Sequence, residues 1–337
     1  MKVTRNASLK SYNTFGIDVK AKTLISVTNI DELISVLKNN YEEDLFILGG
    51  GSNMLLTKDV DTNVIHIDLK GIDVVRETGE SVFVKANAGE NWHEFVLYTL
   101  QHNWGGLENL SLIPGNVGTS PIQNIGAYGV ELKDYFYSCE AINIQTLEIV
   151  NFTAEECEFA YRNSIFKEKL KGKFIITNVV FQLTKTNHKL LTNYGAINDA
   201  LKEMGVENPE IKDISNAVIK IRQEKLPDPK ILGNSGSFFK NPVINTPEFE
   251  ILKKQFPEIP HYSVGENNIK IPAGWLIDKA GLKGYREGDA GVHKNQALVL
   301  VNFGKATGEE ILNLARKVQT EIFTKFNIQL EPEVNII

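Results

Sequence analysis

Residues 106–132 read GLENLSLIPGNVGTSPIQNIGAYGVEL, a long stretch with few charges in which glycines alternate with prolines, hydroxyls and amides. A loop of this length without regular structure is uncommon in a compact domain and is usually either functional or disordered. Apolar residues such as Leu112 and Ile113 argue against disorder. Small residues and amide side chains are typical of a backbone that wraps around a large planar cofactor, with Gln123 and Asn124 supplying oriented hydrogen bonds.

A second glycine-rich segment, LFILGGGSNMLL (45–56), brings three glycines directly after a predicted strand. Consecutive glycines allow backbone N–H groups to approach an anion such as a diphosphate. The segment matches neither GxGxxG nor GxxxxGK[ST], so it indicates neither a Rossmann nor a P-loop geometry. Taken alone, it is compatible with phosphate binding or with a plain turn.

Composition narrows the class of protein. The chain has 337 residues, enough for two or three domains, and its formal net charge of −6 argues against a nucleic-acid-binding protein. Cys139 and Cys157 lack metal-ligand spacing, so we expect two reduced thiols and no metal site. The N-terminus lacks a signal peptide, and no apolar run approaches about 18 residues. We therefore expect a cytoplasmic protein that does not associate with membranes.

Hydrophobic periodicity predicts alternating strands and helices. Strands are expected at 21–27, 45–48, 64–69, 81–89, 141–144, 148–153, 174–184 and 297–303. Helices are expected after a cap at Thr28 or Asn29, and at 91–101, 196–204, 214–224, 246–256, 272–281 and 307–326. Thr307 and Glu310 form a capping box for the last of these. The prolines of LPDPK (226–230) mark a boundary between two α+β or α/β halves, with the C-terminal tail returning to the first.

The IPGNVGTSPIQNIGAYG stretch, preceded by GGGSN and by NTFG at 13–16, resembles the UDP-N-acetylenolpyruvoylglucosamine reductases. This family, also called UDP-N-acetylmuramate dehydrogenases, acts in bacterial peptidoglycan precursor synthesis. Matching motifs run from Asn13 to Glu333, essentially the whole chain. The resemblance implies an α+β chain with an FAD-binding fold of the vanillyl-alcohol-oxidase (PCMH) type in two subdomains, plus a C-terminal α/β substrate-binding domain. The implied divisions are 1–68 with the tail 327–337, then 69–224, then 225–326.

By this resemblance, the two glycine-rich segments form the FAD site, with the diphosphate on their backbone N–H groups. The implied cofactor-binding residues are Gly49, Gly50, Gly51, Ser52, Asn53, Pro114, Gly115, Gly118, Thr119, Ser120, Gln123, Asn124, Ile125, Gly126, Ala127 and Tyr128. Neither 45–56 nor 106–132 contains a histidine or cysteine, which favours a dissociable flavin over a covalent one. NADPH is the implied reductant.

Two charged residues acquire roles from the resemblance. Arg162 in YRNSIFK is a surface charge by position alone, but a guanidinium fork is the best single side chain for a carboxylate. The family motif assigns it to the enolpyruvyl carboxylate of the substrate. Glu333 in LEPEV is an exposed acid by position alone, and the motif assigns it, and not Glu331, to the same region. Crowded carboxyl groups share a proton, which makes Glu333 a plausible donor.

The stretch GNSGSFFKNP (233–242) contains two serines within a predicted turn, followed by two phenylalanines. In the family motif the serine before Phe-Phe is the proton donor, which implies Ser237, whereas Ser235 occupies a variable position. The implied reaction passes hydride from NADPH to FAD and then to the methylene carbon of UDP-N-acetylglucosamine-enolpyruvate. Ser237 then protonates the α-carbon, giving UDP-N-acetylmuramate.

Further residues match the family's substrate contacts, although each taken singly is a solvated surface residue: Tyr161, Tyr194, Lys225, Asn241, Tyr262, Lys283 and Gln296. Asp278, in a predicted helix, is expected to be structural. The only expected partner is the small-molecule substrate, and the chain is expected to be a monomer. Two rivals stay open. Another FAD-dependent oxidoreductase of the same fold is one; the other is a nucleotide-sugar-binding regulator, which we would expect to have lost Arg162, Ser237 or Glu333.

Overall fold

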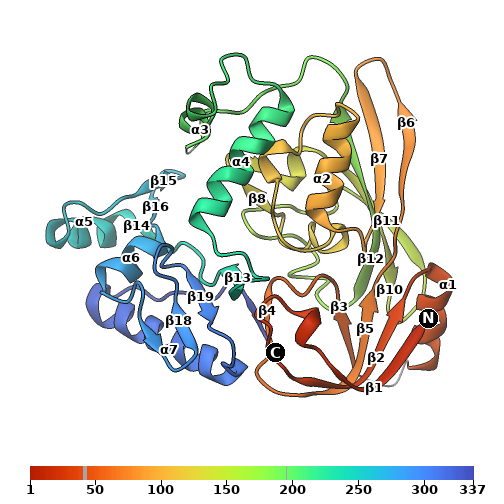
Figure 1. The fold of residues 1–337 in the computed structure, drawn as a ribbon, viewed down its shortest axis with the longest axis horizontal. Helices are drawn as coiled ribbons and strands as arrows, with labels where there is room; N and C mark the ends of the chain where they lie inside the picture. The colour runs from red at the N-terminus through yellow and green to blue at the C-terminus, as the bar shows by residue number, and fades with distance from the viewer. Residues whose placement is uncertain (41–43, 195) are drawn as a thin grey trace. The chain divides into compact units, whose positions relative to one another are not determined.

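The structure is a computed structural model that describes residues 1–40, 44–194 and 196–337 (Figure 1). The chain divides into two compact units built from discontinuous segments. Unit 1 comprises Met1–Ala7, Ala21–Gly50 and Val60–Gln223, and unit 2 comprises Ser8–Lys20, Gly51–Asp59 and Glu224–Ile337. The three-part division implied by the family resemblance stays a prediction.

The first sheet of unit 1 has four strands in the order β1-β2-β5-β3. Its elements are β1 (Lys2–Ser8), β2 (Lys20–Val27), α1 (Ile30–Asn39), β3 (Leu45–Leu48) and β5 (Val60–Ile67). Strands β2 and β3 both run parallel to β5. The Asn29 side chain accepts the N–H of Glu32 and so decides where α1 begins. Leu33, Val36 and Leu37 of α1 pack against the buried residues of β2 and β5.

The second sheet of unit 1 is antiparallel, in the order β11-β10-β12-β7-β6. Its strands are β6 (Ile72–Glu77), β7 (Ser81–Asn87), β10 (Phe136–Asn143), β11 (Ile149–Thr153) and β12 (Phe174–Thr184). Helix α2 (Trp92–Gln101) lies along one face of it (Figure 1). Trp92 and Phe95 contact the ring of Phe181 on β12. Both cysteines are buried in the same cluster as free thiols.

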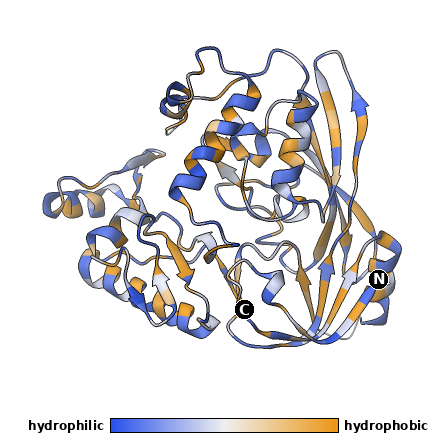
Figure 2. Cartoon of the chain, in the orientation of Figure 1, coloured by the Kyte–Doolittle hydropathy of each residue, from blue (hydrophilic) through white to orange (hydrophobic). Residues whose placement is uncertain are grey.

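Unit 1 also contains the α-helices α3 (Ile197–Glu203) and α4 (Ile211–Lys225). Ile214, Val218 and Ile221 of α4 pack against Ile197 and Leu201 of α3. Their spacing follows the helical repeat, and Figure 2 shows the resulting alternation of hydrophobic and hydrophilic positions along α4. This packing fixes the helix that carries Arg222.

Unit 2 contains small sheets, three α-helices and a short 3-10 helix, η1 (Lys10–Tyr12). Its main sheet has the order β13-β19-β18-β17, a three-stranded sheet has the order β14-β16-β15, and β20 pairs with β4. The elements are β4 (Met54–Leu55), β13 (Gly233–Ser237), β14 (Val243–Asn245), α5 (Thr246–Gln255), β15 (Tyr262–Val264), β16 (Asn268–Lys270), α6 (Ala273–Lys279), β17 (Arg286–Glu287), β18 (Ala290–Val292), β19 (Val299–Asn302), α7 (Gly308–Phe326) and β20 (Asn335–Ile336).

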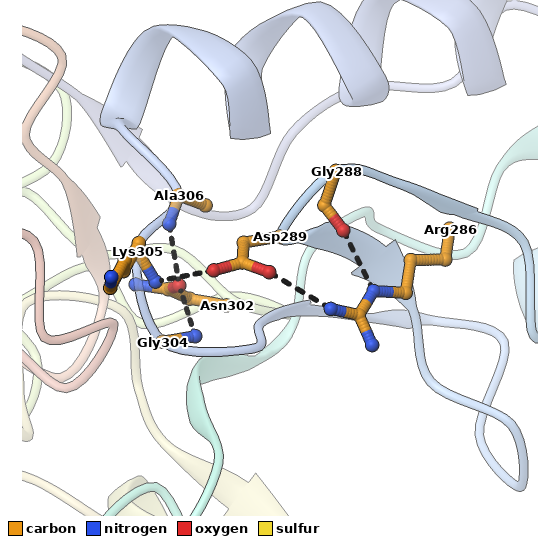
Figure 3. A network of polar contacts seen from close by, with 7 residues as sticks. All are labelled: Arg286, Gly288, Asp289, Asn302, Gly304, Lys305 and Ala306. Atoms are coloured by element: carbon orange, nitrogen blue, oxygen red, sulfur yellow. Dashed lines mark hydrogen bonds and ion pairs between the residues drawn. The ribbon is translucent and has the colours of Figure 1, made fainter.

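The connection from β19 to α7 is held by two polar side chains (Figure 3). Asn302 accepts the N–H groups of Gly304 and Ala306 at 2.8 and 2.9 Å. Asp289 accepts the N–H of Lys305 at 2.9 Å and a guanidinium N–H of Arg286 at 2.8 Å. Thr307 and Glu310 then form the predicted capping box, and α7 ends at Phe326 as expected.

Most elements lie where the sequence predicts them, and the differences have physical causes. Strands β1 and β6 and the sheet β14-β16-β15 are not anticipated, because these segments are short or largely exposed and lack a buried alternating face. Residues 233–237 form a bulged strand, so the interpretation of this stretch as a simple turn was wrong. None of the helices formed by the described residues is long and apolar enough to cross a bilayer.

Gly308, the first residue of α7, is expected to tolerate no side chain. A Cβ at this position would lie 1.8 Å from the carbonyl oxygen of Leu56, which is backbone and cannot rotate away. We expect Gly308→Ala to lower the free energy of unfolding by about 3 kcal/mol despite its better helix propensity. Thermal unfolding would measure the loss. Gly79→Ala is the matched control, since nothing lies within 4 Å of its Cβ position, and an equal effect of both changes would contradict the steric explanation.

Candidate active site

The two predicted cofactor segments meet in unit 1. A Cβ on Gly49 would lie 2.5 Å from Cγ2 of Thr119, and a Cβ on Gly50 would lie 2.9 Å from Cα of Gly115. The two backbones therefore approach each other at a distance that only glycine allows. Such a cradle of exposed backbone suits a diphosphate, so the residues present fit the FAD implied by the sequence.

The 106–132 segment is not free of regular structure, as the sequence suggested, but contains only short elements. These are the 3-10 turns η2 (Glu108–Leu110) and η3 (Val117–Thr119) and the strands β8 (Gly126–Ala127) and β9 (Val130–Glu131), which pair antiparallel. Backbone hydrogen bonds to neighbouring elements order the rest. Trp92 donates its N–H to the carbonyl of Gly115 at 2.9 Å, and Gly118 donates to Ala88 at 3.0 Å. A Cβ on Gly118 would come within 2.4 Å of Cβ of Ala88. The long loop is thus packed onto the end of β7 and the start of α2, which agrees with the prediction that it is not disordered.

Leu112, at the entry to this segment, has a left-handed backbone with φ of 59°. Its N–H is accepted by Nδ1 of His93 at 2.9 Å, and its carbonyl accepts Nε–H of Arg222 at 3.2 Å. Arg222 also hydrogen-bonds Tyr128, whose pKa is raised chiefly by burial. Burial, and to a lesser degree Arg162, lower the pKa of Arg222. Sequence reasoning missed His93 and Arg222, because each stands alone in a helix without a motif.

Acceptance of the Leu112 N–H requires neutral His93. Burial lowers the pKa of His93, an effect that Glu94 opposes and Arg222 reinforces. As the pH falls below about 6.5, unfolded His93 takes up a proton before the folded residue does. We therefore expect the contribution of His93 to the free energy of unfolding and to flavin retention to be constant above that pH. Below it, this contribution should decline.

The pH dependence of His93 can be isolated by comparison with His93→Gln, whose amide oxygen still accepts but does not titrate. Thermal unfolding and flavin fluorescence would be followed from about pH 7.5 to 5 in both proteins. The wild-type protein should lose more stability than the variant over this range. Identical profiles would show that His93 does not contribute.

Arg162 lies in a tight turn in which Ala160 and Asn163 exchange backbone hydrogen bonds of 3.1 and 3.2 Å. Its φ of 53° is one that glycine or asparagine usually adopts, so arginine costs about 1 kcal/mol here. Nη2 of Arg162 donates to the carbonyl of Gly126 at 2.6 Å. A predicted catalytic side chain and the predicted cofactor segment are therefore in direct contact within unit 1.

In unit 2 the bulge in β13 gives the two serines different environments. Asn234 pairs with Val301 and Ser237 with Val299, so one extra residue is accommodated, and Gly236 supplies a φ of 70°. Ser235 is buried and donates its hydroxyl to the carbonyl of Met54 at 3.2 Å. Ser237 is exposed. The two serines therefore differ in burial, and the assignment of Ser237 as the proton donor stays a prediction.

Glu333 lies beside the Ser237 strand. Its N–H donates to the carbonyl of Phe238 at 2.8 Å, and its own carbonyl accepts the side-chain N–H of Asn53 at 3.2 Å. Asn335 donates both backbone and side-chain N–H groups to the carbonyl of Asn53. In the same loop, a Cβ on Gly51 would lie 1.9 Å from the carbonyl oxygen of Tyr12. Part of the GGGSN loop, the C-terminal motif and Ser237 are therefore neighbours in unit 2.

Three predicted substrate residues, Asn241, Lys283 and Gln296, line one pocket of about 320 Å³ together with Trp275 and Asp278. Asn241 accepts the N–H of Ala273 at 2.9 Å, which fixes the orientation of its amide. Lys283 donates to Asp278 at 2.8 Å. Asp278 lies in α6, as predicted, and lines the same pocket, and its expected structural role stays a prediction.

The other predicted substrate residues are exposed. Tyr161, Tyr194 and Tyr262 are 48%, 60% and 61% exposed, and Lys225 at the end of α4 is also exposed. Tyr194 lies against Gly129, where a Cβ would approach its side chain to 3.3 Å. The assignment of these four residues as substrate contacts stays a prediction.

Comparison with known proteins gives the family. The chain is 60% identical over 337 residues to the UDP-N-acetylenolpyruvoylglucosamine reductase of Flavobacterium johnsoniae, covering all of both chains. It is 47% identical to that of Pseudomonas fluorescens, covering 99% of each. The chain belongs to the UDP-N-acetylenolpyruvoylglucosamine reductase family. The family models that match are an FAD binding domain at residues 21–152 and the C-terminal domain of the reductase at 228–337.

Solved structures agree with this family membership. The crystal structure of the reductase from Thermus caldophilus matches with a TM-score of 0.71 at 25% identity, covering 100% of this chain and 99% of the other. A cholesterol oxidase matches with a TM-score of 0.50 at 11% identity, which concerns the fold alone. The predicted fold class, family and FAD cofactor are confirmed. The rival of a different flavoenzyme family is excluded by the same identities.

Proposed function

We propose that this chain reduces the enolpyruvyl ether of UDP-N-acetylglucosamine-enolpyruvate to UDP-N-acetylmuramate, with FAD as cofactor and NADPH as reductant. The relatives that it matches over their full length carry the name of this activity. The observation that carries the mechanism is the β13 bulge, which buries the hydroxyl of Ser235 and leaves that of Ser237 exposed.

Bound FAD would supply the hydride, and the chain's own residues would supply charge and a proton. Addition of hydride to the methylene carbon leaves negative charge on the neighbouring α-carbon and its carboxylate. Arg162 would stabilise that charge as a preorganised cation, with its fork oriented by the bond to Gly126. Ser237 would donate its hydroxyl proton to the α-carbon, since even a weak acid can protonate a strongly basic carbanion.

Glu333 would share a proton with the substrate carboxylate and so assist in stabilising the developing charge. Its backbone bonds to Phe238 and Asn53 support this role, because they anchor it beside the strand that carries Ser237. Phe238 and Phe239 are fully buried next to Ser237 and would exclude water from the reacting carbon.

The pocket of Asn241, Lys283 and Gln296 would receive the UDP moiety. Oriented amides suit the polar edge of a base, Trp275 offers an aromatic surface, and the ammonium of Lys283 suits a diphosphate oxygen. We further propose that the enzyme acts in the cytoplasm, since its proposed substrates are anionic nucleotides that do not cross membranes unaided. The monomeric state stays a prediction.

The proposed function is tested by the visible spectrum and by substrate-dependent oxidation of NADPH. The purified protein should be yellow, or become yellow with added FAD, and should oxidise NADPH only slowly until UDP-N-acetylglucosamine-enolpyruvate is supplied. UDP-N-acetylglucosamine is the matched control, because it lacks the enolpyruvyl group. A protein that binds flavin but oxidises NADPH equally with either sugar would contradict the proposal.

A further inference from the structure

The turn that carries Arg162 is joined to the cofactor segment by three hydrogen bonds at alternate residues. Ser164 Oγ donates to the carbonyl of Ile122 at 2.7 Å. Asn124 Nδ2 donates to the carbonyl of Ala160 at 3.0 Å. The third bond is the one from Arg162 to Gly126 described above. We call the Ser164 and Asn124 bonds the turn anchor.

Both side chains of the turn anchor are buried, Ser164 to 2% exposure and Asn124 to 0%. Asn124 uses its remaining polar capacity inside the protein as well, donating to Glu131 at 3.0 Å and accepting the N–H of Lys133 at 3.1 Å. A carboxamide bonded in this way is directed at the protein rather than at a ligand. The side-chain amide of Asn124 is therefore hydrogen-bonded within the protein, whereas the sequence implies an amide that contacts the cofactor.

The turn anchor brackets a strained backbone. Ala160 and Ser164 flank Arg162, whose left-handed φ is unfavourable for a residue with a side chain. Such a conformation persists only where its surroundings hold it. Gly126, opposite, leaves just enough room, since a Cβ there would lie 3.0 Å from Nη1 of Arg162. The position of the guanidinium is thus set from both sides by the cofactor segment.

We infer that Ser164 and Asn124 are positioning residues that hold the Arg162 guanidinium in a fixed position along the 122–126 cofactor segment. This inference rests on the proposed role of Arg162. Loss of either anchor bond should let the turn relax, and a displacement of about 1 Å at a charge-stabilising group can cost up to one hundred-fold in rate.

A double-mutant cycle tests the inference. Ser164→Ala should lower kcat/KM about ten- to one hundred-fold while the protein keeps its flavin. In an Arg162→Ala background the same change should have less than about a two-fold effect, because the group that it positions is gone. For variants too slow for a steady-state assay, the flavin would first be reduced with NADPH. The return of its absorbance on adding the enolpyruvyl substrate would then be followed over a single turnover. Asn124→Ala should show the same coupling to Arg162→Ala, and it replaces Ser164→Ala in the cycle if that variant folds poorly.

Ser215→Ala is the matched control for a lost buried hydroxyl, since Ser215 is 1% exposed and hydrogen-bonds Ser111 at 2.7 Å. It should lose comparable stability but retain kcat/KM. Equal losses from Ser164→Ala with and without Arg162 would overturn the positioning role. Full activity of Arg162→Ala alone would instead overturn the proposed role of Arg162, so the two failures are distinguishable.

Discussion

Ser237→Ala should abolish most turnover while leaving the flavin bound and reducible. The exposed hydroxyl of Ser237 is the proposed proton donor to the α-carbon, and removal of a positioned general acid typically costs 10²- to 10⁴-fold. NADPH should still bleach the flavin at the wild-type rate. The return of colour on adding the enolpyruvyl substrate should slow by that factor, which stopped-flow absorbance would measure.

Ser235→Ala is the control two residues away. Its hydroxyl bonds the carbonyl of Met54, so the change should lower the free energy of unfolding by about 1 kcal/mol and leave turnover near the wild-type value. The reverse result, with Ser235→Ala inactive and Ser237→Ala active, would overturn the assignment of the donor. Equal loss in both would point to disruption of the bulge instead.

Glu333→Gln should lower kcat about 10²- to 10³-fold, the effect of deleting one group that stabilises developing charge. The amide keeps the shape of the side chain and the backbone bonds to Phe238 and Asn53 but cannot share a proton with the substrate carboxylate. The pH–rate profile should therefore change in shape as well as in height. A rate unaffected by Glu333→Gln at every pH would remove Glu333 from the mechanism.

Glu331→Gln provides the control within the same motif. Glu331 is exposed and pairs with Lys240 at 3.1 Å, an arrangement that contributes about 1 kcal/mol or less. Its replacement should change neither kcat nor the pH profile. The contrast between the two glutamates would separate the specific role of Glu333 from a general effect of removing charge near the C-terminus.

The sequence by itself determined the elements with strong local signals. The Asn29 cap, the Thr307–Glu310 capping box and the periodic strands are visible because each depends on neighbours in the chain. The glycine-rich segments also carried enough pattern to indicate FAD and the family. Short exposed strands such as β6 were not predicted, since they lack a buried face.

Only the tertiary structure decided which polar side chains already form hydrogen bonds within the protein. Ser235 and Ser237 look alike in sequence, yet a bulge buries one against Met54 and exposes the other. Asn124 looks like a cofactor ligand, yet its amide is bonded to Ala160, Glu131 and Lys133. His93 and Arg222 belong to no motif, yet they hydrogen-bond the backbone N–H and the backbone carbonyl of Leu112, respectively. Most of these groups are satisfied by hydrogen bonds to segments at least 19 positions away in the chain, and pairing over such separations leaves no trace in local sequence.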